Sequence, residues 1–590
     1  MKKLTRSLTI GLILASLGVF CAAPLLAQDS KVTAQERLRQ LREAALAADA
    51  EAEKTQDLDV FVDVVEVNIV NVEVYVTDKK GNRITGLTKD DFEIFEDGKP
   101  MAVSNFYAVE DGRPVEGEFA DIVPPEESPE AIAVAAPDQE PELPPEQQLS
   151  LVIYIDNFNI RPPNRNRALR DIRTFLTRNV RAGDQVMLVS YERSLKIRRP
   201  FTRDPQVVAS ALEELERLTG YAAQRDFDRR ETLDRIEDAR SSAEALTWVR
   251  GYAENIQNDL RFTIGALKEI TSSLAGLPGR KAILYVSDGV PMVAGQDLFH
   301  AVDGIHGSGS GAITEAFGYD ASARFRELAS QANANRITFY TLDAAGLRVS
   351  NAISAENSRS EPLGIESINT SNLQSPLRFV ADTTGGFAIV NRNRFDGLLE
   401  RVATDFKTFY SLGYRAPEAG RGRYHRIKVK LKNGKGLRVR HREGYRDKTV
   451  EARMADGALS VLHFNFERNP LGARLFFGTE SRRDRRFFTV PIEVRIPISK
   501  LVQIPRGETH ESRLRLYIAA MDDEGGTSPV QQQAIPISIP TDEIENARKQ
   551  DYVYTLSLLM REGDHKVAVG IRDEVASQES FVLGQVRVGG

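Results

Sequence analysis

The chain has 590 residues, with 78 Lys and Arg against 84 Asp and Glu and a formal net charge of −6. This length exceeds what one hydrophobic core organises, so several domains are expected. Cys21 is the only cysteine and precedes the expected start of the mature chain. Disulfides, thiol nucleophiles and cysteine metal sites are therefore excluded from the mature protein.

Residues 1–27 have the pattern of a secretory signal peptide. Lys2 and Arg6 give a basic start, an apolar run spans 8–26, and small residues favour cleavage after Ala27. The alternative is a retained membrane anchor, which the glycines and proline inside the run disfavour. No later apolar stretch of the sequence approaches membrane-spanning length. We therefore expect an exported protein, periplasmic or secreted, with no retained transmembrane segment.

Residues 28–58 are rich in Ala, Glu, Gln and Arg and predict an exposed helix. Residues 59–109 predict β structure, because VDVVEVNIVNVEVYVTD alternates with period two and turn signals follow it. About fifty residues are few for a sheet domain of its own. We therefore expect this segment to pair with 408–446 in one β-sandwich, with an α/β domain inserted between them.

An acidic segment follows at 110–148. It holds twelve Asp or Glu against one Arg, and eight of the chain's 26 prolines. Such a segment buries too little apolar surface to offset its ordering entropy. We expect a disordered acidic linker with a net charge of −11.

Residues 149–407 alternate buried-type strands with amphipathic helical stretches. The strands read LSLVIYID, DQVMLVSY, RKAILYVSDG, RITFYTLDA and GGFAIVN, each an apolar run typical of a parallel sheet. This order predicts a doubly wound α/β domain of Rossmann-like type. The charged helical stretch 224–270 is longer than one crossover needs. Ligands of such sheets bind outside the carboxyl ends of the strands, where Asp156 and Asp288 stand.

After Thr408 the alternation returns to period two. It predicts a β hairpin segment at 408–446, with a turn at Asn433-Gly434. Residues 447–480 read as a connector, and several closely spaced strands in 481–590 predict a C-terminal β-sandwich. The chain as a whole is expected to be a multidomain α+β protein.

The strand endings VIYID, GDQVMLVSY, RKAILYVSDG and ITFYTLDA resemble those of a von Willebrand factor type A (VWFA) domain. VTDKKGNRITGLTKDDFEIFEDGKP precedes them, and TTGG, FYSLGYR and EGYR follow. The ordered set resembles a VWFA-related subgroup of secreted proteins best known from Acidobacteria, and it covers roughly residues 60–446. This resemblance implies an adhesion-type protein that binds another protein and is not an enzyme.

The VWFA family commonly binds a divalent cation at a metal-ion-dependent adhesion site and, through it, an acidic group of a partner. Its pattern is Asp-x-Ser-x-Ser after the first strand, a Thr in a second loop and an Asp in a third. These oxygen ligands suit Mg²⁺. By this resemblance Asp156, Thr219 and Asp288 take the Asp, Thr and third-loop positions. Phe158 and Ile160 replace the two serines and offer no side-chain oxygen.

The resemblance therefore implies a degenerate metal site. Asn157 or Asn159 could compensate with a carbonyl oxygen. The degenerate set then comprises Asp156, Asn159, Thr219 and Asp288. The loss of two ligands predicts weak Mg²⁺ binding at most and no required cofactor. We favour an interpretation in which both aspartates accept hydrogen bonds from loop amides or from Arg165 and Arg167.

The loops at the carboxyl ends of the strands are expected to form the contact surface for an unknown protein partner. The expected contact residues are Asn157, Phe158, Arg165 and Arg167. The alternative function is a hydrolase or metal-dependent enzyme that uses Asp156 and Asp288. No Gly-x-Ser-x-Gly or His-Glu-x-x-His motif occurs in the sequence, so neither of those enzyme classes gains support.

Residues 420–448 hold twelve Lys or Arg against two acidic residues. Ile427, Val429 and Leu431 alternate with lysines, so one face of the strand is apolar and the other is basic. The default interpretation is a solvated face. The functional alternative is an anionic partner, either a polysaccharide or the chain's own acidic linker. Nucleic acid is not expected for an exported chain without interleaved aromatic residues.

Overall fold

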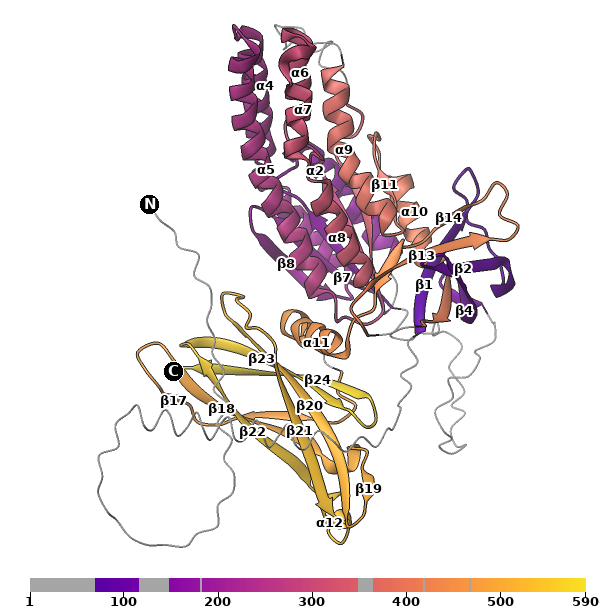
Figure 1. Cartoon of the computed structure of the whole chain (residues 1–590), viewed down its shortest axis with the longest axis vertical. Helices are drawn as coiled ribbons and strands as arrows, with labels where there is room; N and C mark the ends of the chain where they lie inside the picture. Colours follow the sequence, from indigo (N-terminus) through magenta and orange to yellow (C-terminus); the bar gives the residue numbers. More distant parts are fainter. Residues whose placement is uncertain are drawn as a thin grey trace. The chain divides into compact units, whose positions relative to one another are not determined.

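A computed structural model describes residues 69–115, 148–180, 183–348, 364–417, 420–465 and 468–589 (Figure 1). The expected signal peptide, the helix expected at 28–58 and most of the acidic linker lie outside these residues. Among the helices in the described ranges, none is both long and apolar enough to cross a membrane.

The segments before and after the α/β domain form two antiparallel sheets together. One sheet has the order β14-β1-β12-β4-β5 and the other β15-β13-β2-β3. Val72 of β1 lies opposite Leu412 of β12, and Ile94 of β2 lies opposite Val429 of β13. The strands are β1 (Ile69–Thr77), β2 (Phe92–Glu96), β3 (Lys99–Met101), β4 (Val103–Glu110), β5 (Arg113–Val115), β12 (Phe409–Arg415), β13 (Tyr424–Leu431), β14 (Arg438–Arg440) and β15 (Gly444–Arg446).

Inward residues of both sheets share one core, to which Val74, Ile94 and Tyr414 belong. These residues recur at every second position of their strands, which is the period that turns alternate side chains to one face. Each sheet takes strands from both segments. Neither segment therefore completes a sheet alone, and the two must fold together.

Two details of this sandwich differ from the sequence expectation. The strands on either side of the turn at 432–436 do not pair with each other, because β13 pairs with β2 and β15 whereas β14 pairs with β1. The expected hairpin is thus wrong, and the chain crosses there between sheets. The linker also begins later than expected, since Glu110 pairs with Arg113 across a turn at Asp111-Gly112.

The inserted domain is a six-stranded sheet with the order β11-β10-β9-β6-β7-β8. All neighbours are parallel except the edge pair β7 and β8, which is antiparallel. Counted from β6, the order is 3-2-1-4-5-6, the doubly wound arrangement. The strands are β6 (Leu149–Ile155), β7 (Gln185–Tyr191), β8 (Leu195–Thr202), β9 (Arg280–Ser287), β10 (Ile337–Asp343) and β11 (Ala388–Ile389).

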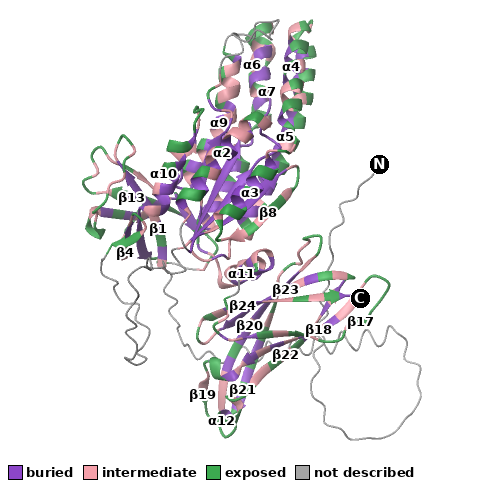
Figure 2. Cartoon of the chain, turned by 180° about the vertical axis from the view of Figure 1, so that it is seen from behind, coloured by how far each residue is buried: buried purple, intermediate pink, exposed green. Residues whose placement is uncertain are grey.

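Helices cover both faces of this sheet, so its central strands are buried throughout (Figure 2). Leu151, Ile153 and Ile155 of β6 pack in the core with α2, α3 and α10, whereas Val152 and Tyr154 pack with α5, α8 and α9. This two-sided burial explains the unbroken apolar runs. The helices are α2 (Pro162–Asn179), α3 (Pro205–Leu215), α5 (Ser242–Ser273), α8 (Ser322–Ala334), α9 (Ile365–Thr383) and α10 (Asp396–Lys407).

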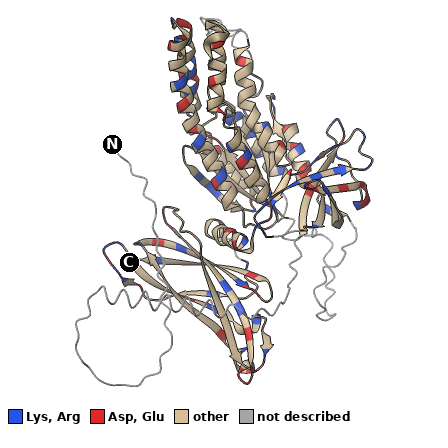
Figure 3. Ribbon diagram, in the orientation of Figure 1, with Lys and Arg blue, Asp and Glu red and all other residues tan. Residues whose placement is uncertain are grey.

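The long helical stretch noted in the sequence builds a helical extension. α4 (Ala222–Asp238) and the first half of α5 pack with α6 (Gln296–His306) and α7 (Ala312–Ala316) around a separate core that includes Leu233, Val249 and Phe299. Basic and acidic residues are interspersed along α4 (Figure 3). The extension stands beside the carboxyl ends of the strands and contributes side chains there.

The C-terminal region has two further antiparallel sheets whose inward residues share one core. The connector expected at 447–480 is wrong, because residues 450–464 form helix α11, which packs Ala458, Val461 and Leu462 against Ala519 and Ala568. The elements are α11 (Val450–Phe464), β16 (Arg474–Phe477), β17 (Ser481–Arg482), β18 (Phe488–Pro497), β19 (Ile504–Arg506), β20 (Thr509–Asp522), β21 (Gln531–Pro540), α12 (Ile544–Ala547), β22 (Asp551–Met560), β23 (Gly563–Asp573) and β24 (Gln578–Val588).

Candidate functional site

The strand order of the α/β domain reverses between β6 and β9, which lie side by side. The crevice of a doubly wound sheet opens outside the carboxyl ends of these two strands. Asp156 follows β6, Asp288 follows β9 and Asp343 ends β10. All three aspartates are buried. The structure thus brings together the two aspartates that the sequence singled out and adds a third.

Asp156 is fully buried, and both of its carboxylate oxygens have donors within the chain. Tyr285 donates its hydroxyl to Oδ2 at 2.5 Å, and Ser287 Oγ lies 3.3 Å from the same oxygen. The main-chain N–H of Asn159 donates to Oδ1 at 3.1 Å, and its side-chain amide reaches both oxygens. Burial raises the pKa of Asp156 above its ordinary value, against the opposing effect of these hydrogen bonds.

The residues at the two serine positions belong to the hydrophobic core. Ile160 is fully buried, and the Phe158 ring lies 6.0 Å from the Tyr191 ring and 5.7 Å from the Tyr221 ring. Thr219 is exposed, and its main-chain carbonyl accepts a hydrogen bond from Asn157 Nδ2 at 2.9 Å. These residues hold the loop together by packing and by internal hydrogen bonds.

These contacts do not fit the Mg²⁺ ion that the resemblance implies. Asp156 has no oxygen without a donor, and Phe158 and Ile160 have no side-chain oxygen at all. Asn159 Oδ1 accepts a hydrogen bond from the Arg225 guanidinium at 2.5 Å, so the compensating oxygen is also engaged. The Arg225 guanidinium therefore lies near Asp156, and its charge lowers the pKa of that carboxyl.

Arg225 was not among the residues expected from the sequence. It lies on α4, 66 residues after Asn159, within the helical stretch that exceeded the length of a crossover. That excess length was the only feature of the sequence that could have indicated that this helix places a side chain at the carboxyl ends of the strands.

Asp288 differs from Asp156, because one of its oxygens is buried without a hydrogen-bond partner. Oδ2 accepts from the main-chain N–H of Arg161 and from Asn164 Nδ2, both at 2.9 Å. Oδ1 has no partner. Burial, with a smaller contribution from the charge of Asp343, raises the pKa of Asp288 to about 6, although the hydrogen bonds from Arg161 and Asn164 and the charge of Arg348 act to lower it.

Gly289 fixes the main chain beside Asp288. Its φ is +98°, and a Cβ atom there would meet the carbonyl oxygen of Leu373 at 2.7 Å. Only glycine adopts this conformation without strain, which accounts for the glycine after Asp288.

A polar cavity of about 450 Å³ opens beside Asp288, between the start of α2, α4, the β9–α6 loop and α9. Arg161 pairs with Asp226 at 2.6 Å, Arg229 with Asp297 at 2.6 Å, and Arg348 with Asp343 at 3.3 Å. The charged lining residues are Arg161, Arg225, Asp226, Arg229, Arg230, Asp288, Asp297, Arg348 and Glu366. Five arginines thus face four acidic side chains.

The expected partner-contact residues need correction. Asn157, Phe158 and Arg165 are buried, with Arg165 fully enclosed, so none of them is available to a partner. Arg165 donates to Asn157 Oδ1 and to the carbonyls of Glu216 and Leu218. These hydrogen bonds hold α2 against the loop that precedes Thr219.

Arg167 is half-buried and donates to the carbonyl of Ala344 at 2.5 Å. The sequence interpretation allowed Arg165 and Arg167 to donate to Asp156 or Asp288. Neither arginine does so. The loop amides of Asn159 and Arg161 do so instead. Of the arginines beside the cavity, Arg161 and Arg230 are exposed and Arg225 is half-buried.

Comparisons with known proteins give only distant likenesses. No family model matches the chain, and no curated protein matches it. Among solved structures, an aerotolerance-related membrane protein from Bacteroides fragilis is 12% identical, with 44% of this chain and 98% of that chain covered and a TM-score of 0.24.

Two other solved structures cover more of the chain. A von Willebrand factor type A protein from Catenulispora acidiphila is 11% identical over 75% of this chain and 66% of that chain, with a TM-score of 0.21. The pilus adhesin SpaC from Lactobacillus rhamnosus GG is 9% identical over 75% and 53%, with a TM-score of 0.23. The TM-scores of all three structures are low. At such TM-scores they carry no argument about function.

Proposed function

We propose that this chain is an exported, non-enzymatic interaction protein of VWFA type, which binds an acidic group of a partner in the cavity beside Asp288. The proposal includes membership of the subgroup of secreted VWFA-related proteins that the sequence resembles. In place of a bridging metal ion, the guanidinium groups of the cavity supply the positive charge. The protein partner itself stays unnamed, and no bound cofactor is required.

One observation carries the proposal: Arg225 lines the arginine-rich cavity and donates a hydrogen bond to Asn159, which in turn donates to the fully buried Asp156. A guanidinium offers paired N–H donors whose spacing matches a carboxylate. Arg225 makes its hydrogen bond to a neutral amide oxygen rather than to a carboxylate. An incoming carboxylate therefore meets an arginine whose charge is less neutralised than that of Arg161 or Arg229.

The test is capture of a partner from native cell envelope by the full-length chain. Wild-type protein is compared with Arg225→Glu and with a matched control, Arg170→Glu, at an exposed position of α2 away from the cavity. Capture should be lost with Arg225→Glu, kept with Arg170→Glu, and unchanged by EDTA. Capture that requires a divalent cation, or that survives Arg225→Glu, contradicts the proposal.

A second candidate function is a hydrolase or another enzyme that uses Asp288 and Asp156. The observation in its favour is Asp288 itself, a buried cavity carboxyl with an unpartnered oxygen and a pKa of about 6, near the range of a general base. A panel of ester, peptide and glycoside substrates tests it. Turnover with a pH limb near 6 that Asp288→Asn abolishes would favour the enzyme, and equal turnover by the two proteins would exclude Asp288 as its base.

A further inference from the structure

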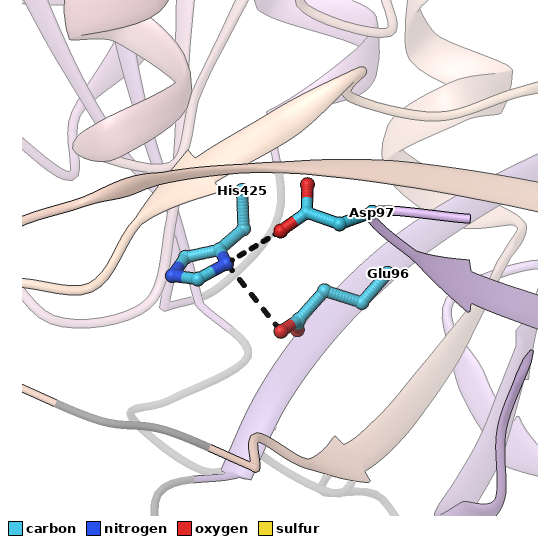
Figure 4. A group of neighbouring side chains, drawn as sticks. All are labelled: Glu96, Asp97 and His425. Atoms are coloured by element: carbon cyan, nitrogen blue, oxygen red, sulfur yellow. Dashed lines mark hydrogen bonds and ion pairs between the residues drawn. The ribbon is translucent and has the colours of Figure 1, made fainter. Parts of the chain in front are cut away.

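We propose that Glu96, Asp97 and His425 bind a Zn²⁺ ion in the β-sandwich that flanks the α/β domain. Glu96 ends β2, Asp97 begins the following turn, and His425 lies on the neighbouring strand β13 (Figure 4). One ligand atom of each lies within 4.8 Å of the others. This site does not involve the cavity beside Asp288, so it stands or falls independently of the proposed function.

The distances suit a common metal ion. His425 Nδ1 lies 2.9 Å from Asp97 Oδ2 and 3.5 Å from Glu96 Oε1. Ligands about 2.0–2.1 Å from a tetrahedral Zn²⁺ are separated by roughly 3.3 Å, between these two values. One imidazole nitrogen with two carboxylate oxygens is also a donor set that Zn²⁺ accepts and that differs from the all-oxygen sets of Mg²⁺ and Ca²⁺.

Both carboxylates are held by their second oxygen. Glu96 Oε2 accepts hydrogen bonds from the Tyr414 hydroxyl at 2.6 Å and the Tyr445 hydroxyl at 3.0 Å. Asp97 Oδ1 accepts from the main-chain N–H of Arg426 at 2.8 Å. Such outer partners orient metal ligands, and they leave one oxygen of each carboxylate facing His425.

The histidine is also fixed and has a suitable outer partner. Its ring stacks on Tyr445 at 5.2 Å, it is 8% exposed, and its Nε2 has no hydrogen-bond partner. Asp447 Oδ2 lies 3.8 Å from Nε2. With Nδ1 on a metal, the proton sits on Nε2 and faces a carboxylate, the arrangement that strengthens a histidine ligand.

A hydrogen bond from His425 to Asp97 is the simpler account of the same side chains. It explains the 2.9 Å contact but not why Glu96 Oε1 also faces Nδ1, at 3.5 Å, nor why three carboxylates surround one ring. A cation at the centre uses all three facing atoms. Asp97 is half-exposed, at 49% of its side chain, which leaves room for a water as the fourth ligand.

The site joins the two halves of the sandwich. Asp97 and His425 are 328 residues apart in sequence, with the whole α/β domain between them. A metal bound only by the folded site stabilises the fold by mass action and closes a very long loop. Zn²⁺ would therefore fasten the segment before the inserted domain to the segment after it.

The experiment uses the full chain stripped with EDTA and titrated with ZnCl₂ in a calorimeter, with MgCl₂ and CaCl₂ as comparisons. We expect one Zn²⁺ per chain, a raised Tm, and no comparable binding of Mg²⁺ or Ca²⁺. His425→Gln should weaken affinity at least about 100-fold, and Tyr445→Phe, which removes one outer hydrogen bond, about tenfold. His300→Gln, on α6 and outside the cluster, should bind like the wild type.

Asp97→Asn is the second test if His425→Gln does not fold. Asp97 has a φ of +49°, which asparagine tolerates, so this variant keeps the turn while removing one charged ligand. It should weaken Zn²⁺ binding about tenfold or more. The proposal is overturned if stripped wild-type protein binds no Zn²⁺, or if wild type, His425→Gln and Asp97→Asn show the same affinity and Tm shift.

Discussion

The molecule contains two clusters of carboxylates whose residue types are alike and whose environments differ. At the carboxyl ends of β6 and β9, the oxygens of Asp156 are both taken by donors of the chain, and Arg225 supplies a positive charge nearby. In the flanking sandwich, Glu96 and Asp97 each use one oxygen for the chain and keep one facing His425.

The difference shows that an aspartate at the expected place is a weak sign of a metal site. Whether a metal ion can bind depends on how many ligand oxygens lack a donor within the chain. At the α/β site both oxygens of Asp156 have donors and only Oδ1 of Asp288 has none, whereas in the sandwich cluster one oxygen each of Glu96 and Asp97 faces Nδ1 of His425.

Restoring the family pattern should damage the α/β domain and not create a metal site. Phe158→Ser with Ile160→Ser removes two buried apolar side chains and buries hydroxyls, which should lower the free energy of unfolding by about 5 kcal/mol. Denaturation in urea measures the loss. Millimolar Mg²⁺ should hardly move the Tm of wild type or variant. A Mg²⁺ shift in the wild type that Asp156→Ala abolishes would show instead that the site still binds metal.

Asp156 itself should prove structural. Asp156→Ala leaves the Tyr285 hydroxyl and the Asn159 amides without their acceptor in a fully buried site, so we expect a loss of about 4 kcal/mol. Asp156→Asn keeps one oxygen acceptor and should lose less. The exposed Asp90 serves as the control, with a loss near zero on replacement by Ala. Similar stabilities for Asp156→Ala and the control would refute a structural role.

Asp288 should make stability depend on pH with a definite sign. Its pKa in the folded protein, about 6, lies above the ordinary aspartate value of 3.8, so folding favours the protonated carboxyl. The stabilising contribution is complete below about pH 4 and is lost as pH rises through 6, a change of about 3 kcal/mol.

Asp288→Asn tests this sign because it removes the charge and keeps an oxygen that accepts from Arg161. The variant should be more stable than wild type at pH 7 by about 3 kcal/mol and nearly equal to it at pH 4. Urea denaturation across this range gives the difference at each pH. A difference that does not change with pH would mean that the carboxylate is already solvated or paired.

The two clusters also differ in how far they could be predicted from the sequence. The doubly wound sheet was predictable, because strands buried on both faces leave unbroken apolar runs, and Asp156 and Asp288 were found because such strands end at the ligand edge. The mutual pairing of the flanking segments followed from their small size. These signals are local in sequence or follow from size alone.

The parts that escaped the sequence depend on contacts between distant residues. Arg225 reaches Asn159 from another helix, and His425 meets Asp97 across 328 residues. Helix α11 escaped for a different reason. Its buried face mixes Val461 and Leu462 with small residues such as Gly457, where a Cβ would meet the Phe581 ring at 2.2 Å, so the apolar pattern of an amphipathic helix is weak in its sequence.

The smallest effect concerns the other face of the strand that carries His425. Lys428 and Lys430 of β13 are exposed, on the face opposite His425, as the alternation predicted. The acidic residues of 116–147 lie outside the described part of the chain, but tethering gives them a high effective concentration near these lysines. We hypothesise that they compete with an external polyanion for the basic face.

Heparin binding by the full chain with and without residues 116–147 tests that competition. The deletion should tighten binding a few-fold, most clearly at low salt, because exposed ion pairs are each worth about 0–1 kcal/mol and are screened over about 8 Å at physiological salt. Lys428→Glu with Lys430→Glu should weaken it. His425→Gln should leave heparin binding unchanged, since His425 is buried and the lysines are exposed on the opposite face of β13. Equal affinity of the full and deleted chains at every salt concentration would show that the lysines form a solvated face and that the linker does not compete for it.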